Sequence, residues 1–182
     1  IEWKWVYITK DTTDEQINSF YNSLQEKKFI IKPNNLRGGL GIRIGHTIEE
    51  LYDLKNDVIL VEEIVKNHES ISILNPTSLN TIRVVTVVDN NNIPHIVAMA
   101  LRTEGKGSVI DNAHGGGTFY HIDLSTGIID TPARDSYGNY YVKHPTSEKV
   151  MPGFLIPHFD ELKQYCIDLA SKLHNARYVG WD

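Results

Sequence analysis

The sequence predicts an α+β protein that is built from two small lobes with mostly antiparallel sheets. Helical and extended segments alternate over the first part of the chain, whereas β-rich runs dominate the rest. The alternation stops near residues 64–67, so we place the boundary there, between a lobe of residues 1–65 and a lobe of residues 66–182. A chain of 182 residues is long enough for two such lobes.

The first lobe is expected to begin with an amphipathic helix. Thr12 and Glu15 have the spacing of a capping box, and apolar residues then recur every three or four positions over residues 13–26. The other elements of this lobe are predicted as strands at residues 29–33, 41–44 and 58–63 and a short helix that begins at Thr47, with Glu50 completing a second capping box.

The second lobe is expected to be richer in strands. Residues 80–89 and 94–103 form a predicted hairpin with three asparagines, residues 90–92, at its turn. The other predicted elements are a short helix at residues 67–74, a Gly-rich stretch at 105–117, a hairpin that turns at Thr126–Gly127, irregular structure with short strands at 133–157, a helix opened by Asp160 and a strand at 177–181. Because the chain begins and ends in segments with strand character, we expect both lobes to be incomplete at their ends.

Composition excludes several functional classes. The sequence is 41% hydrophobic and 23% charged, as is typical of soluble globular proteins, and its net charge of −5 argues against broad binding to nucleic acid or anionic membranes. No apolar run approaches the roughly 20 residues that cross a bilayer. Cys166 is the only cysteine and is expected to be a buried core thiol. We therefore expect a cytoplasmic protein without an internal disulfide.

The first segment that could bind a ligand consists of a strand, a Gly-rich loop and a second strand. Lys32 ends the first strand, where its ammonium group can lie over bound phosphates. Gly38, Gly39 and Gly41 would let backbone N–H groups approach the same phosphates without Cβ clashes. The alternative is an ordinary turn between two strands.

The second segment is the strand that leads into the predicted boundary. Its end carries Glu62 and Glu63, followed by Val65. Backbone groups of such a connector can pair with an adenine edge while apolar side chains enclose the base. A pair of exposed glutamates is the alternative.

The third and fourth segments lie in the second lobe. Strand alternation places Thr81 and Arg83 on one face, and the hairpin brings Arg102 to the same wall, where guanidinium groups suit phosphate or carboxylate. Solvated arginines are the alternative. Asn112 and His114 precede three consecutive glycines, whose cost in backbone entropy favours the close approach of a ligand. His114 is then a base, a phosphate contact or neither.

The order of these segments resembles the ATP-grasp superfamily over residues 28–182. The run Ser78–Thr86 and the end Val179–Asp182 are most similar to the sugar-transfer-associated branch, which is related to α-L-glutamate ligases. The resemblance implies two α+β lobes that hold ATP between them, and transfer of the γ-phosphate to a carboxylate. An amine or similar nucleophile then attacks the acylphosphate.

The resemblance also implies roles for individual residues. For the nucleotide, they are Lys32 at the α/β-phosphates, Gly38, Gly39 and Gly41 in the phosphate lid, Glu62, Glu63 and Val65 around adenine, and Glu69 at the ribose. For the chemistry, they are Arg83 and Arg102 at the phosphoryl group or the acid, Asn112 and His114 beside the acceptor, and Asp182 as a Mg²⁺ ligand.

The sequence also departs from the family pattern. The Glu-x-Asn metal motif is expected beyond Asp182, and an upstream lysine is expected before Ile1. We therefore expect a ligase as the parent protein, acting in sugar-transfer or surface-polysaccharide pathways, and little turnover by this piece alone. The identity of the acid, an amino acid or a sugar-linked group, stays open.

Two other functions are considered. One is a catalytically inactive ATP-grasp module that binds nucleotide or serves as a scaffold. The other is an unrelated carbohydrate-binding domain that stacks sugars on Trp3, Trp5 or the tyrosines of residues 137–141, although aromatic strand residues usually pack in a core.

Overall fold

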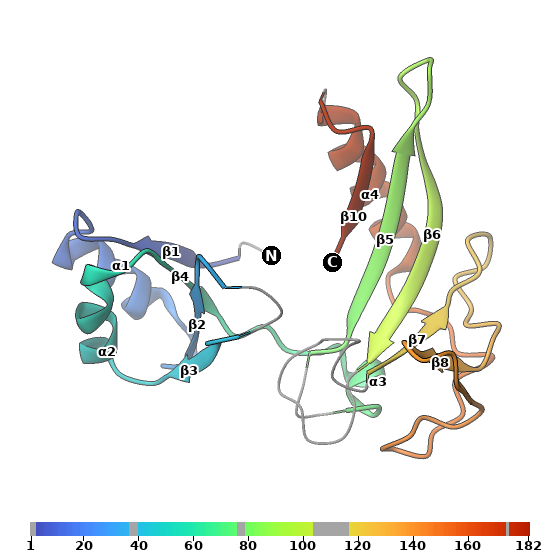
Figure 1. Ribbon diagram of the computed structural model, residues 1–182, viewed down its shortest axis with the longest axis horizontal. Helices are drawn as coiled ribbons and strands as arrows, with labels where there is room; N and C mark the ends of the chain where they lie inside the picture. The colour runs from blue at the N-terminus through green and yellow to red at the C-terminus, as the bar shows by residue number, and fades with distance from the viewer. Residues whose placement is uncertain (1–2, 37–39, 76–78, 104–116, 174) are drawn as a thin grey trace. The chain divides into compact units, whose positions relative to one another are not determined.

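The chain folds into two compact units, Ile1–Lys66 and Asn67–Asp182 (Figure 1). The computed structural model describes residues 3–36, 40–75, 79–103, 117–173 and 175–182. Each unit contains an antiparallel sheet and helices, which confirms the predicted α+β class. None of the helices within these ranges has the length and apolarity needed to span a membrane.

The first unit is a four-stranded antiparallel sheet with two helices on one face. The strand order is β1-β4-β2-β3. The strands are β1 (Trp5–Ile8), β2 (Phe29–Pro33), β3 (Arg43–Gly45) and β4 (Ile59–Glu63), and the helices are α1 (Asp14–Ser23) and α2 (Ile48–Asp53), the latter followed by a 3-10 turn, Leu54–Asn56.

The core of this unit follows from strand alternation. Phe29 and Ile31 of β2 lie opposite Glu63 and Val61 of β4, and the apolar members of these pairs are fully buried against the two helices. Alternate positions face the other way, so Lys32 and Glu62 share the face that the helices leave open.

The start of α1 differs from the prediction by one residue. Thr13 is the N-cap, and its partner in the capping box is Gln16. The Thr12 hydroxyl instead closes the preceding turn: it donates to Tyr7 O at 3.2 Å and accepts from Thr9 N at 2.9 Å. The predicted Thr12–Glu15 box is therefore wrong, because the local turn that precedes the helix uses the Thr12 hydroxyl.

The end of α1 also differs from the prediction. The helix stops at Ser23 rather than at residue 26, because Leu24 adopts an extended backbone and buries its side chain in the core. The second predicted box is confirmed, since Glu50 Oε1 accepts from the Thr47 N–H at 3.1 Å.

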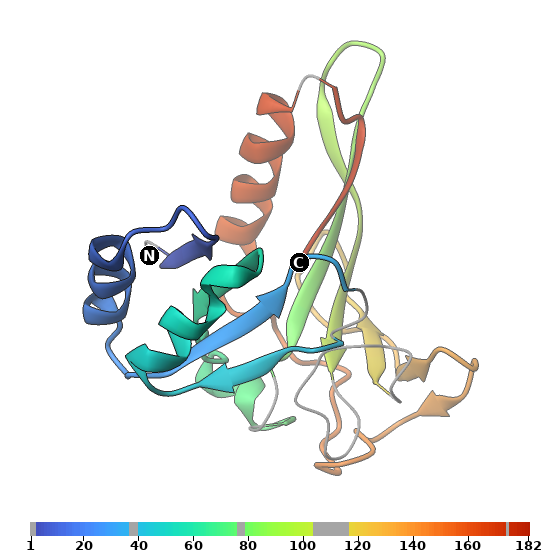
Figure 2. The ribbon, with the colours of Figure 1, turned by 60° about the vertical axis from the view of Figure 1, so that its left-hand side comes forward.

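The second unit is a six-stranded antiparallel sheet in the order β10-β5-β6-β7-β8-β9. The elements are α3 (Glu69–Ser72), β5 (Thr81–Val88), β6 (Pro94–Thr103), β7 (Thr118–His121), β8 (Ala133–Asp135), β9 (Tyr140–Tyr141), α4 (Phe159–Lys172) and β10 (Tyr178–Trp181). Helix α4 packs on β5 and β6, where Cys166 is buried as expected (Figure 2). The predicted Asn turn joins β5 and β6, with Asn92 at a φ of 62°.

A buried histidine ties the end of β6 to the start of β7. His144 Nε2 lies 3.1 Å from Thr103 Oγ1, which in turn lies 2.8 Å from Thr118 Oγ1. His144 Nδ1 accepts from the Ser147 N–H at 3.2 Å, so the ring is held as a neutral imidazole. Burial lowers the pKa of His144 below its ordinary value.

We expect this histidine to make the second unit sensitive to mild acid. A lowered folded-state pKa means that the unfolded chain takes up the proton first, so the stabilisation is complete above about pH 6.5 and is lost as the pH falls below it. Urea unfolding between pH 7.5 and 5.5 should show a free energy of unfolding that falls by at most about 1.4 kcal/mol per pH unit from this group. The slope should diminish in His144→Gln. Equal slopes in the two proteins would contradict the assignment.

Candidate functional site

Two arginines and one aspartate form an ionic cluster on the sheet of the second unit. Arg83 grips the Asp182 carboxylate with two donors: Nε lies 2.7 Å from Oδ1 and Nη2 lies 2.6 Å from Oδ2. Arg102 Nη1 donates to the same Oδ1 at 2.7 Å. The predicted pair of arginines therefore does lie on one wall, and Asp182 joins it.

Sheet register explains why these three side chains meet. Arg83 is paired with Ala100 and Thr81 with Arg102, and cross-strand partners in an antiparallel sheet point to the same face. On the other side of β5, β10 pairs antiparallel and brings Asp182 alongside. Buried residues at the alternate positions, such as Val84 and Leu101, face α4, so the cluster lies on the face away from that helix.

Two neighbours hold the end of β10 in place. The Trp181 indole N–H donates to Thr86 Oγ1 at 2.9 Å. Gly180 lies against Arg83: a Cβ there would be 3.2 Å from Nη1, which is closer than ordinary van der Waals contact. Glycine at this position therefore lets the Arg83 guanidinium lie close to the β10 backbone.

The cluster holds side chains of the type that bind anions. Two guanidinium groups bind the Asp182 carboxylate. Arg102 is the less exposed of the two arginines, with 21% of its side chain accessible, whereas 45% of the Asp182 side chain is accessible. Guanidinium forks match carboxylate and phosphate oxygens, and Asp182 itself illustrates the binding of a carboxylate by both arginines.

Lys32 lies in the first unit and forms an ion pair with Glu62. The two side chains share the sheet face that the helices leave open, and the Glu62 side chain is only 14% accessible. The paired carboxylate positions the ammonium group of Lys32.

Some backbone groups of the residues predicted around adenine already form hydrogen bonds within the sheet. Strand β4 is flanked by β1 and β2, the Glu63 N–H donates to Lys4 O at 3.0 Å, and Glu63 Oε1 accepts from the Lys4 N–H at 3.0 Å. Val65 follows the strand and is exposed. If an adenine pairs with this backbone, it meets residues beyond Glu63.

The structure describes only some of the glycines and loop residues that were predicted to belong to the site. Gly41 has a φ of 75°, and a Cβ there would meet Leu36 and Pro33, so local geometry alone accounts for glycine at this position. Glu69 is exposed in the first turn of α3. Gly38, Gly39, Asn112 and His114 lie outside the described residues.

The sheet face around the arginines carries further polar and aromatic residues that the sequence reasoning missed. Phe119 lies opposite Arg102, and His121 lies opposite Ala100. His121 Nδ1 is 2.7 Å from Asp130 Oδ1, an orientation that leaves Nε2 directed away from this carboxylate. The alternation of buried Thr118 and Tyr120 with exposed Phe119 and His121 was the available signal, but four residues are a weak pattern.

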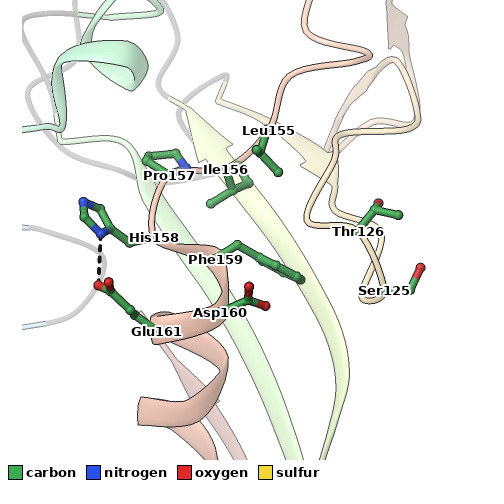
Figure 3. Close-up of a pocket in the computed structure, with 9 residues that line it drawn as sticks. All are labelled: Ser125, Thr126, Leu155, Ile156, Pro157, His158, Phe159, Asp160 and Glu161. Carbon is green, nitrogen blue, oxygen red and sulfur yellow. Dashed lines mark hydrogen bonds and ion pairs between the residues drawn. The ribbon is translucent and has the colours of Figure 1, made fainter.

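A separate pocket of about 500 Å³ lies at the start of α4 and includes none of the predicted site residues (Figure 3). His158 Nδ1 lies 2.9 Å from Glu161 Oε2, and Asp160 adds a second carboxylate. The lining residues include no lysine or arginine, so this pocket does not suit a phosphate-bearing ligand.

The chain is thus a two-unit α+β protein with a cluster of two arginines and an aspartate on its larger sheet. Residues 50–182 match the family described as sugar-transfer-associated ATP-grasp. The chain therefore belongs to this family, as its resemblance implied. The comparison with curated proteins found no match.

Two solved structures were found to be similar at low identity. The D-alanine-D-alanine ligase from Coxiella burnetii has 9% identity and a TM-score of 0.35, over 95% of this chain and 51% of that one. The D-alanyl-alanine synthetase A from Vibrio cholerae has 9% identity and a TM-score of 0.36, over 93% of this chain and 60% of that one. The chain thus spans between half and two thirds of the length of these proteins.

Proposed function

We propose that this chain is the ATP-binding region of an ATP-dependent carboxylate–amine ligase that acts through an acylphosphate, in a sugar-transfer or surface-polysaccharide pathway. The observation that carries the proposal is the Arg83–Asp182–Arg102 cluster, which lies within the span that matches the ATP-grasp family. Its arginines offer fixed donors to an anionic substrate and to a phosphoryl group in transfer.

Arg83 and Arg102 bind the acid and stabilise negative charge on the transferring phosphoryl group. Their donors are held in place before reaction, since Arg83 makes two hydrogen bonds to the Asp182 carboxylate and Arg102 donates to Oδ1 of the same carboxylate. Preorganised donors of this kind lower the barrier to phosphoryl transfer because they need no rearrangement as charge develops.

ATP and Mg²⁺ fit the described residues to different degrees. Lys32 would contact the phosphates of ATP, and its partner Glu62 keeps the ammonium group positioned. Asp182 would hold Mg²⁺, which requires few protein carboxylates when phosphate oxygens and water complete its shell. When bound, Mg²⁺ neutralises charge on the triphosphate. The carboxylate would have to be shared with two guanidinium groups.

A catalytically inactive nucleotide-binding module is the second candidate. It is favoured by one observation: the carboxylate of Asp182, the predicted Mg²⁺ ligand, is bound by two guanidinium groups. The presence or absence of Glu-x-Asn in the protein beyond Asp182 distinguishes the two candidates.

Thermal unfolding with and without millimolar Mg·ATP tests the nucleotide site. Ligand at 100 times its Kd should stabilise the chain by about 2.7 kcal/mol, a shift of several degrees in Tm. Lys32→Ala should abolish this shift because the phosphates lose their cation. Its own Tm will also fall, since Glu62 loses a partner, so the readout is the shift on adding Mg·ATP.

Lys28→Ala is the matched control, because Lys28 is an exposed lysine shortly before β2. It should retain the full shift. A shift that persists in Lys32→Ala would remove Lys32 from the site. No shift in any protein, including a chain extended past Asp182, would overturn the proposed function.

A further inference from the structure

A continuous row of side chains crosses the sheet of the second unit, starting at the arginine cluster. Register pairs Thr81 with Arg102, Arg102 with Phe119, Phe119 with Arg134, and Arg134 with Tyr140. Cross-strand partners share a face, so all five lie on the face away from α4. The alternate positions in β6, β7 and β8, which are Leu101, Tyr120 and Ala133, are fully buried in the core.

Arg134 is positioned by the aromatic ring beside it. Its guanidinium carbon lies 4.4 Å from the centre of the Tyr140 ring, a cation–π contact. In the part of the chain that the structure describes, no carboxylate forms an ion pair with Arg134. The ring holds one face of the guanidinium group, so the N–H donors at its edge stay available to an anion.

The spacing along the row sets the size of a ligand that reaches both Arg102 and Arg134. Arg102 and Arg134 stand on strands separated by β7, so their backbones are roughly 10 Å apart. Phe119 lies between them and is exposed. The surface therefore presents a cation, an apolar ring and a second cation in order.

We propose that Arg134, Phe119 and Tyr140 form a second subsite for the acid substrate. The substrate class is an acid that carries a second anionic group, carboxylate or phosphate, joined to the first by an apolar or ring-shaped spacer. The reacting carboxylate binds at Arg83 and Arg102, the spacer lies on Phe119, and Arg134 takes the distal anion. This inference rests on the proposed function, which places the acid at the arginine cluster.

The test compares suberate with octanoate, which have the same carbon chain but differ in the distal carboxylate. Titration into the chain is followed by NMR, at constant ionic strength, through the Nε–Hε signals of the arginines. Suberate should bind at least about tenfold more tightly than octanoate and should perturb the signals of both Arg102 and Arg134. A phosphono acid of similar length distinguishes the two anions, and a preference for either over octanoate supports the subsite.

Variants separate the subsite from general charge effects. Arg134→Ala should remove the preference for suberate, and Tyr140→Leu should reduce it. Tyr137→Leu is the matched control, because Tyr137 is exposed nearby but lies outside the row, and it should leave the preference intact.

The remaining outcomes distinguish a failure of the second subsite from a failure of the proposed acid site. Equal binding of suberate and octanoate at Arg102 would overturn the second subsite and leave the acid site standing. Binding of neither would overturn the subsite and the placement of the acid, while the Mg·ATP shift would still report on the nucleotide site. A preference for suberate that survives in Arg134→Ala would also overturn the subsite.

Discussion

Asp182→Asn should increase the affinity of the arginine cluster for inorganic phosphate about tenfold. The substitution removes the negative charge that Arg83 and Arg102 now share and releases at least one charge-assisted hydrogen bond. Such a bond contributes roughly 1.5–3 kcal/mol, and 1.4 kcal/mol corresponds to a factor of ten in Kd. We take the lower end because the carboxylate is partly exposed and therefore screened.

Phosphate titration at constant ionic strength, followed through the arginine Nε–Hε signals, measures this effect. Asp168→Asn changes the net charge equally but lies on α4, so it should leave phosphate affinity unchanged. Adding Arg102→Ala to Asp182→Asn should cancel the gain. Phosphate binding that is indifferent to Asp182 would show that these arginines do not form an anion site.

Phe29→Ala should destabilise the first unit by about 3–5 kcal/mol, the usual cost of removing a buried phenylalanine. Phe29 is fully buried, meets Tyr21 edge-on at 6.3 Å between ring centres, and covers Gly45 of the neighbouring strand. Hydrogen exchange should show loss of protection in β2 and β4. Ile44→Ala, one residue from Gly45 and exposed, should change stability by no more than about 0.5 kcal/mol.

Gly45 allows a sharper test of the same contact. A methyl group at this position would overlap the Phe29 ring, so Gly45→Ala should destabilise the otherwise unchanged protein. In the Phe29→Ala background the same methyl group would enter the vacated space, and its effect should reverse sign. If the two substitutions have additive effects on the free energy of unfolding, the two residues do not pack as the structure shows.

Features that depend on local pattern could be predicted from the sequence alone. Strands β2 and β6 have the predicted bounds, because apolar alternation and turn residues specify strands of this length. Alternation also led to the expectation that Arg83 and Arg102 would share a wall. The structure has them on one face because the pairing of β5 with β6 shifts by one residue between Val85 and Thr86, which the short turn does not specify. The family followed from the order of such segments.

Aromatic exposure could not be predicted in this way. The expectation that strand aromatics pack in a core is wrong for Trp5 of β1 and Tyr140 of β9, which are exposed. The strands that carry these residues are too short for an apolar alternation that identifies the buried face, and β9 has only two residues. Which face is buried depends on where the helices pack.

Contacts between distant segments could not be predicted from the sequence, because they depend on how the strands pair. Asp182 is 99 residues from Arg83 and 80 from Arg102, and it reaches them because β10 pairs with β5 rather than with another edge. Local propensity selects helices and strands, but the pairing of strands is settled by which apolar faces can be buried together, and that choice involves the whole sheet.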